Sequence, residues 1–116
     1  MILLVDDNRV SREAFAKILR LHGHEVMEAA DASAGLHIMD NNHFDLVITD
    51  FVMPNISGFQ LIAHVRQKWP GTAILLMSGY LTPEVGEMIS DGVEFIAKPV
   101  DVPVLLNAIE RLVPRQ

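Results

Sequence analysis

The chain has 116 residues, half of them hydrophobic, with a formal net charge of −6 and no cysteine. This length fits one domain, because typical domains hold about 100–150 residues. The lack of cysteine excludes disulfides and thiolate metal sites, and the scattered basic residues lack the positive stripe that nucleic-acid binding requires. No apolar run approaches the roughly 18 residues of a membrane helix, and no basic leader precedes Ile2. We therefore expect a cytoplasmic protein without nucleic-acid or membrane partners.

The first predicted strand is Ile2–Val5, a continuous apolar run typical of a parallel strand covered on both faces. A helix follows, and Gly23 is a stop signal for its C-terminus. One face of this helix is marked by apolar residues at helical spacing: Val10, Ala14, Ile18 and Leu21. The next run, Glu25–Glu28, is more polar and suits an edge strand.

A second, short helix is predicted because Ala32, Leu36 and Met39 would share one face. The third strand is Leu46–Thr49, again almost entirely apolar. Ser57 has capping-box spacing to the glutamine three residues later, which indicates the start of a third helix.

The fourth strand is Ala73–Met77, and Thr82 before a proline then indicates the start of a fourth helix. A fifth strand, Glu94–Ala97, is followed by Asp101, which can cap a fifth helix in the same way. Five strands and five helices thus alternate strictly. This order predicts an α/β fold with parallel strands joined by right-handed crossovers.

Polar residues follow four of these strands at their carboxyl ends, where doubly wound sheets bind ligands. Five such residues would converge at one edge of the sheet: Asp6, Asp7, Asp50, Ser78 and Lys98. A single strand-end aspartate usually caps a helix, but five coincidences at one edge favour a binding site. Like charges about 4 Å apart repel by about 4 kcal/mol at an effective dielectric of about 20. A divalent cation would neutralise the cluster, and oxygen-only ligands favour Mg²⁺ or Mn²⁺ over zinc.

These residues have the order and approximate spacing of a known pattern. Asp6-Asp7, the segment from Asp50 to Gly58, Ser78-Gly79 and Lys98-Pro99 together resemble the receiver domain of two-component response regulators, including the single-domain chemotaxis regulator. The resemblance covers the whole chain, residues 1–116, as a single receiver domain. It implies a flavodoxin-like, doubly wound five-stranded parallel sheet of order 2-1-3-4-5 with five helices.

The resemblance implies that Asp50 is the phosphoacceptor, which takes a phosphoryl group from a phosphohistidine of a sensor histidine kinase or phosphotransfer protein. It implies that Asp7 and Asp50 ligate Mg²⁺ directly, together with the backbone carbonyl of Val52. Asp6 would act mainly through a bound water. A carboxylate nucleophile needs no deprotonation at neutral pH, so the protein mainly supplies positioning and charge neutralisation.

The remaining implied roles concern the phosphoryl group and the switch. Lys98 would pair with Asp50 and then with a phosphoryl oxygen, and its peptide bond to Pro99 would be cis. Ser78 would donate its hydroxyl to another phosphoryl oxygen, beside the backbone N–H of Gly79. Phe95 would swing inward as the Ser78 hydroxyl moves. The output surface would be the last helix-strand-helix region, about residues 82–112, acting on an unknown downstream protein.

Two side chains are expected to control water access to the phosphoryl group. In the family, the positions of Val52 and Tyr80 flank the path of the hydrolysing water. Val52 offers that water no hydrogen bond, and the ring of Tyr80 can cover its approach. We expect slow autodephosphorylation, in a protein that is a monomer or a weak phosphorylation-dependent dimer.

Other functions fit less well. A phosphatase of the haloacid dehalogenase type places its nucleophile after the first strand with a second aspartate two positions on, whereas Asp6 and Asp7 are adjacent. A flavodoxin-like cofactor binder needs a phosphate loop there, and Asp6 and Asp7 would repel phosphate. Within the receiver interpretation, a stand-alone regulator, a relay shuttle and a module of a hybrid kinase or larger regulator all remain open.

Overall fold

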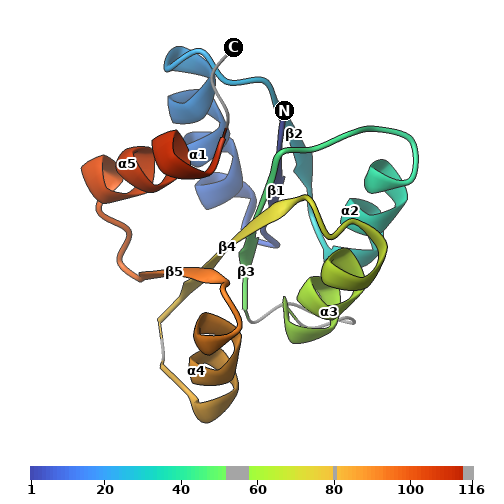
Figure 1. Cartoon of the computed structure of the whole chain (residues 1–116). Helices are drawn as coiled ribbons and strands as arrows, with labels where there is room; N and C mark the ends of the chain where they lie inside the picture. The colour runs from blue at the N-terminus through green and yellow to red at the C-terminus, as the bar shows by residue number, and fades with distance from the viewer. Residues whose placement is uncertain (52–57, 80, 114–116) are drawn as a thin grey trace.

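The computed structural model describes residues 1–51, 58–79 and 81–113. Its centre is a five-stranded parallel sheet of order β2-β1-β3-β4-β5 (Figure 1). The strands are β1 (Ile2–Val5), β2 (Val26–Ala29), β3 (Leu46–Asp50), β4 (Ala73–Ser78) and β5 (Glu94–Ala97). The expected doubly wound α/β fold is therefore confirmed, and the polar second run does form an edge strand.

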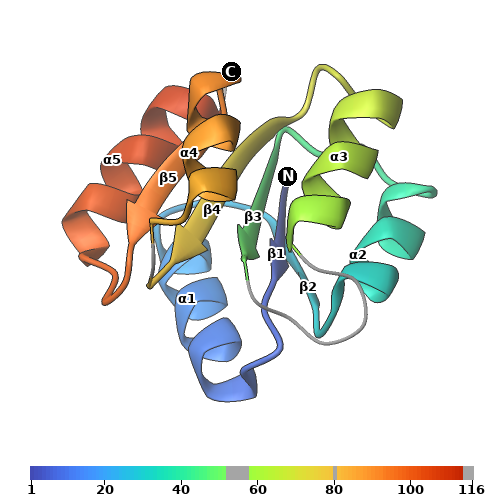
Figure 2. The ribbon, with the colours of Figure 1, turned by 90° about the horizontal axis from the view of Figure 1, so that it is seen from below.

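A helix follows each strand in the chain. The five helices are α1 (Arg9–Leu21), α2 (Ala32–Met39), α3 (Gly58–Lys68), α4 (Pro83–Ser90) and α5 (Val102–Leu112). Figure 2 shows α1 and α5 together on one side of the sheet and α2 and α3 on the other. Both faces of the sheet are thus covered, which is why β1 and β3 contain almost no polar residue.

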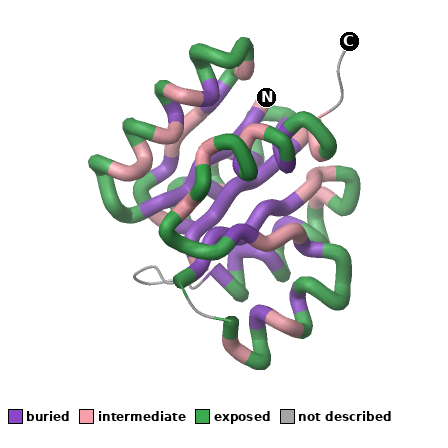
Figure 3. Tube along the Cα trace, turned by 90° about the vertical axis from the view of Figure 1, so that its left-hand side faces the viewer, coloured by how far each residue is buried: buried purple, intermediate pink, exposed green. Residues whose placement is uncertain are grey.

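The core consists of two clusters, one on each face of the sheet. Along β1, Leu3 and Val5 face one cluster with residues of α2, α3 and α4, while Ile2 and Leu4 face the other with residues of α1 and α5. This alternation follows from the two-residue repeat of a strand. The burial map shows the strands as the buried centre of the molecule (Figure 3).

The predicted capping residues start their helices. Thr82 accepts a hydrogen bond from the amide of Val85 at 3.2 Å, and Asp101 accepts one from the amide of Val104 at 3.2 Å. Gly23, just after α1, has φ of +89°, a left-handed conformation that glycine adopts without steric penalty. Ser57 lies outside the described residues.

The predicted apolar face of α1 is not the face that packs on the sheet. Val10 is 80% exposed and Leu21 is 75% exposed, whereas Ala16 and Leu19 are fully buried. The helix carries two apolar stripes at helical spacing, and the periodicity alone did not distinguish them. Because α1 packs through the other stripe, Val10 and Leu21 remain at the surface.

No helix in the described part of the chain is long and apolar enough to cross a membrane.

Candidate functional site

The register of the sheet brings the predicted polar residues to one edge. Val5 of β1 pairs with Thr49 of β3, so the next residues, Asp6 and Asp50, lie at the same level on adjacent strands. Asp50 in turn pairs with Met77 of β4, which places Ser78 one residue farther along. Strand ends that are far apart in the sequence therefore form one site at the carboxyl edge of the sheet.

Three carboxylates form a cluster at this edge. Each of Asp6, Asp7 and Asp50 offers one oxygen, and these oxygens all lie within 4.8 Å of one another. Among the described residues, this is the group of His, Cys, Asp and Glu side chains whose spacing could hold a metal ion. Asp6 and Asp50 are buried and Asp7 is exposed, so the cluster opens to solvent on the Asp7 side.

Lys98 reaches the cluster from β5, two strands away from β3. Its Nζ lies 2.5 Å from Oδ2 of Asp50, and its backbone amide donates to the carbonyl of Ser78 at 2.9 Å. The peptide bond between Lys98 and Pro99 is cis, the isomer that the resemblance implied. The long lysine stem carries the charge from the end of β5 to the carboxylate of β3, which a shorter cationic side chain could not do.

The environment of Asp6 disfavours its charged form. Burial raises the pKa of this carboxyl above its usual value of 3.8, and the nearby carboxylates of Asp50 and Asp7 raise it further. A hydrogen bond from the amide of Asn8 to Oδ1, at 2.9 Å, and the charge of Lys98 act in the opposite direction. Desolvation is the largest of these effects, and the Asn8 hydrogen bond and the Lys98 charge do not offset it, so the pKa of Asp6 is raised on balance.

Gly58 lets α3 begin directly against the backbone of Asp50. A Cβ atom at this position would lie 2.6 Å from the Asp50 carbonyl oxygen and 2.7 Å from the Cα of Phe51. Real Cβ atoms essentially never approach backbone atoms so closely, so a larger residue would displace the chain. Gly58 belongs to the segment that carries the resemblance, but its role could not be predicted from the sequence, because a close backbone approach is a tertiary property.

The structure places three other predicted residues around this edge. Ser78 is buried at the end of β4, and Gly79 after it is exposed with open space around its Cα. Phe95 on β5 is partly buried and packs against the core cluster on the α4 side of the sheet. Val52 and Tyr80, the expected water-access residues, lie outside the described residues.

Residues 2–110 match the sequence profile described as Response regulator receiver domain. The chain belongs to this family. Receivers belong to two-component signal transduction, and their Mg²⁺ binds in an acidic pocket like the cluster of Asp6, Asp7 and Asp50.

Two longer proteins are similar to this receiver over nearly all of its length. This receiver is 35% identical over 112 residues to the Response regulator protein FleR of Pseudomonas aeruginosa, covering 95% of this chain and 24% of FleR. It is also 35% identical over 113 residues to the CAI-1 autoinducer sensor kinase/phosphatase CqsS of Vibrio cholerae, covering 93% of this chain and 16% of CqsS. The chain therefore spans a quarter or less of the length of these relatives.

Solved receiver structures match the chain nearly end to end. The chemotaxis protein CheY4 of Vibrio cholerae has a TM-score of 0.88 at 29% identity, covering 97% of each chain. The receiver domain of Hybrid Histidine Kinase CckA has a TM-score of 0.81 at 33% identity, covering 97% of this chain and 98% of that one. The receiver fold is thus shown, whereas whole-protein activities differ among these relatives.

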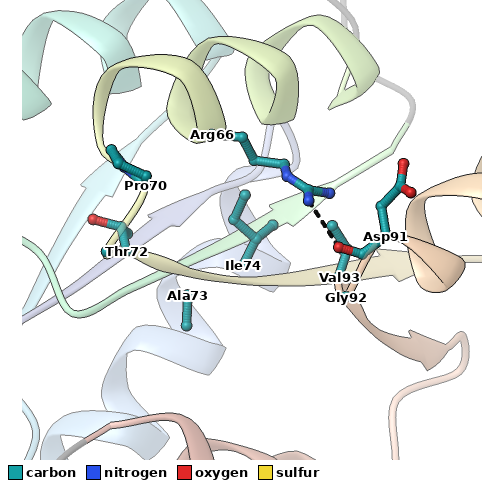
Figure 4. A pocket seen from close by; sticks show the side chains of 9 residues that line it. Arg66, Pro70, Thr72, Ala73, Ile74, Asp91, Gly92 and Val93 are labelled. Atoms are coloured by element: carbon teal, nitrogen blue, oxygen red, sulfur yellow. Dashed lines mark hydrogen bonds between the residues drawn. The ribbon is translucent and has the colours of Figure 1, made fainter.

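One cavity of this receiver lies away from the acidic site. It has a volume of about 370 Å³ and lies at the opposite end of β4, beside Thr72, Ala73 and Ile74 (Figure 4). Arg66 of α3 crosses it and donates to the carbonyl of Asp91 at 2.7 Å. We assign the chemistry to the acidic site, because clustered carboxylates and a lysine define it and the cavity beside β4 is not lined by a comparable set of groups.

Proposed function

We propose that this receiver accepts a phosphoryl group on Asp50 from the phosphohistidine of a sensor histidine kinase or a phosphotransfer protein. The observation that supports this most is the ion pair between Lys98 Nζ and Asp50 Oδ2, 2.5 Å long, inside the cluster of three carboxylates. A lone acidic cluster could serve only a cation. A lysine held on one of its carboxylates adds a partner for a second anion, the phosphoryl group.

In the transfer, a carboxylate oxygen of Asp50 attacks phosphorus while the phosphorus–nitrogen bond of the donor breaks. The donor histidine keeps the electron pair of that bond, and Asp50 becomes an acyl phosphate. Such reactions need alignment and charge stabilisation more than proton transfer. The receiver supplies both, so it is a phosphoacceptor signalling protein that catalyses its own phosphotransfer and a slow autodephosphorylation.

The donor set fits a divalent hard cation, since it consists of carboxylate oxygens with excess negative charge. Asp7, Asp50 and the backbone carbonyl of Val52 would hold Mg²⁺ or Mn²⁺ directly, and Asp6 would act through a bound water. When bound, the cation would neutralise the carboxylates and the phosphoryl oxygens. Because phosphorylation makes Asp50 more negative, this neutralisation matters most in the product.

The remaining residues act on the phosphoryl group and on the switch. Lys98 moves from the carboxylate to a phosphoryl oxygen, and Ser78 and the amide of Gly79 donate to another. Movement of Ser78 toward the phosphoryl group frees space for Phe95, which alters the α4-β5-α5 surface. A ligand shifts such an equilibrium only through contacts it makes in one state, and the phosphoryl group provides them. Beryllofluoride should therefore shift amide resonances across residues 82–112, and shifts confined to the pocket would contradict a switch.

The kinase or phosphotransfer partner would dock on α1, around Val10, Ala14 and Phe15, beside the acceptor. The exposure of Val10, 80%, supports this, because it leaves an apolar side chain at the start of α1, four residues after Asp6. The partner that receives the signal would bind the α4-β5-α5 surface. We place the protein in the cytoplasm, as one receiver unit over residues 1–116. It would act as a monomer or weak phosphorylation-dependent dimer, either alone or as a module of a hybrid kinase or larger regulator.

The deciding experiment is labelling with acetyl phosphate or phosphoramidate in the presence of Mg²⁺. The parent should form an acid-stable, hydroxylamine-labile acyl phosphate that maps to Asp50, and Asp50→Asn should form none. A phosphatase of the haloacid dehalogenase type would instead carry the label after the first strand, at Asp6. Full labelling of Asp50→Asn would defeat the site assignment.

A further inference from the structure

Asp6 is held at each of its polar groups. Its amide donates to the carbonyl of Ala29 at 3.1 Å, and its carboxylate accepts the amide of Asn8 at 2.9 Å. Its carbonyl accepts a hydrogen bond from Nη1 of Arg12, also at 2.9 Å. The first two partners are backbone groups of the sheet and of the turn. The third partner, Arg12, is a side chain of α1 that donates to the backbone of the acidic pair.

The guanidinium of Arg12 is well placed to act as a rigid support. It belongs to the first turn of α1, its side chain is only 14% exposed, and its Nε lies 3.3 Å from Oε1 of Glu28 on β2. That ion pair orients the planar group, so the Nη1 donor points at the Asp6 carbonyl. The buried Nε itself makes no hydrogen bond of good geometry, so this arginine is held by charge and by its Nη1 contact.

We propose that Arg12 is a positioning residue for the Asp6-Asp7 pair, and that it acts by fixing the peptide unit between these two residues. The Asp6 carbonyl and the Asp7 amide belong to the same planar peptide, so holding the carbonyl sets the direction in which Asp7 leaves the strand. Asp7 is exposed, which makes its orientation depend on this backbone more than on packing. The inference rests on the proposed function, because it concerns residues that would hold Mg²⁺.

The plain alternative is that Arg12 only ties α1 to the edge strand. Arg20, about two turns farther along α1, offers a matched comparison. It also pairs with Glu28, at 3.2 Å, and its Nη2 also donates to a backbone carbonyl, that of Val26, at 2.8 Å. The two arginines thus make the same kinds of contact between α1 and β2. They differ in that only the carbonyl held by Arg12 belongs to the acidic pair.

The test compares Arg12→Gln with Arg20→Gln by isothermal titration with Mg²⁺ and by thermal melting without it. Both variants should melt at a lower temperature than the parent, since each loses an ion pair with Glu28. Only Arg12→Gln should raise the dissociation constant for Mg²⁺, by about tenfold, which is the usual effect of removing a group that orients metal ligands. Arg12→Lys keeps a charge and one donor but not the planar fork, and it should restore part of the affinity.

Amide hydrogen exchange in the apo protein tests the positioning role of Arg12 without Mg²⁺. In the apo protein, the amide of Asn8 should exchange with solvent faster in Arg12→Gln than in the parent, because its acceptor Asp6 is less firmly held. The amide of Ala34 donates to the Asp31 side chain at the start of α2. Its exchange rate should rise only by the amount that the loss of global stability causes.

Equal Mg²⁺ affinity in Arg12→Gln and the parent, or an equal loss in Arg20→Gln, would overturn this inference alone. A parent that binds no Mg²⁺ would overturn the proposed function together with it.

Discussion

The ammonium of Lys98 lies 2.5 Å from the carboxylate of Asp50, although 48 residues separate them in the chain. The Asp50 side chain is 12% exposed and the Lys98 side chain 36% exposed, so the pair is partly shielded from water. This pair links the end of β5 to the end of β3 across β4. It therefore couples the candidate acceptor to the strand that carries Phe95.

Replacing Lys98 by alanine should slow labelling of Asp50 by a small phosphodonor by about a hundredfold, which is the effect that removing one donor to a developing anion has in enzymes. The variant should also lose about 1–2 kcal/mol of unfolding free energy, because Asp50 loses a charged hydrogen-bond partner. Lys68→Ala is the matched control, since it removes a surface ion pair with Asp40 of similar length, 2.6 Å. Equal labelling rates for the two variants would remove Lys98 from the proposed site.

Neutralising Asp7 should make the apo protein more stable. Asp7 contributes to the repulsion that raises the pKa of Asp6, so we expect Asp7→Asn to gain up to about 1 kcal/mol without metal. Mg²⁺ should raise the melting temperature of the parent, as any ligand of the native state does, and should do so far less in the variant. Asp50→Asn removes a negative charge too but leaves Lys98 without its partner, so its gain should be smaller. If both variants melt below the parent without Mg²⁺, the argument from charge crowding is wrong.

Asp6 should contribute stability to the apo protein that is lost as the pH rises above about 4. The folded protein has a raised pKa at Asp6, whereas the unfolded chain keeps a pKa near the usual 3.8. Below 3.8 both states hold the proton, and as the pH rises toward the folded pKa the native state must give up a proton that it binds more tightly. Urea unfolding at a series of pH values should show this decline in the parent and not in Asp6→Asn. The surface variant Glu87→Gln should behave like the parent, and a decline that persists in Asp6→Asn would assign it to another group.

Gly58→Ala should disturb the acceptor without touching a charged group. The added Cβ would collide with the Asp50 carbonyl, at 2.6 Å, so the variant should lose stability by about 1–3 kcal/mol and label more slowly. Gly86→Ala in α4 is the control, because nothing lies within 4 Å of its added Cβ. There we expect a gain of about 0.5–1 kcal/mol from helix propensity. A Gly58→Ala variant as stable and as readily labelled as the parent would contradict the close approach.

The fifth prediction concerns Val52 and Tyr80 and rests on the sequence, since both lie outside the described residues. Val52→Asn with Tyr80→Glu should offer the attacking water hydrogen bonds and a more open path, which an in-line attack requires. Dephosphorylation of Asp50 should become several-fold faster while Mg²⁺ affinity stays the same. The decay of isolated phosphoprotein measures the rate. An unchanged rate in the double variant, or rapid decay in the parent, would show that these positions do not limit hydrolysis.

The sequence was sufficient to predict the fold and the meeting of Asp6, Asp50 and Lys98 at one edge of the sheet. The alternation of apolar runs with helical stretches predicts parallel strands, and parallel strands end at the same edge of a sheet, so Asp6, Asp50 and Lys98 had to converge. The caps of α4 and α5 were equally readable, because Thr82 and Asp101 act on amides only three residues away. A short segment of sequence is enough to predict such a cap, because the capping side chain and the amide that it accepts from are close in the chain.

Three features were decided only by the tertiary structure. The sequence did not decide which face of α1 packs on the sheet, because the helix carries two apolar stripes; Val10 and Leu21 are exposed, whereas Ala16 and Leu19 are buried. The roles of Gly58 and Arg12 were not predicted, because each depends on a distance to the backbone of another element. Periodicity and motif spacing describe what a segment can do on its own. The packing of α1 and α3 on the sheet determines which backbone atoms come into contact, and this packing depends on the whole core.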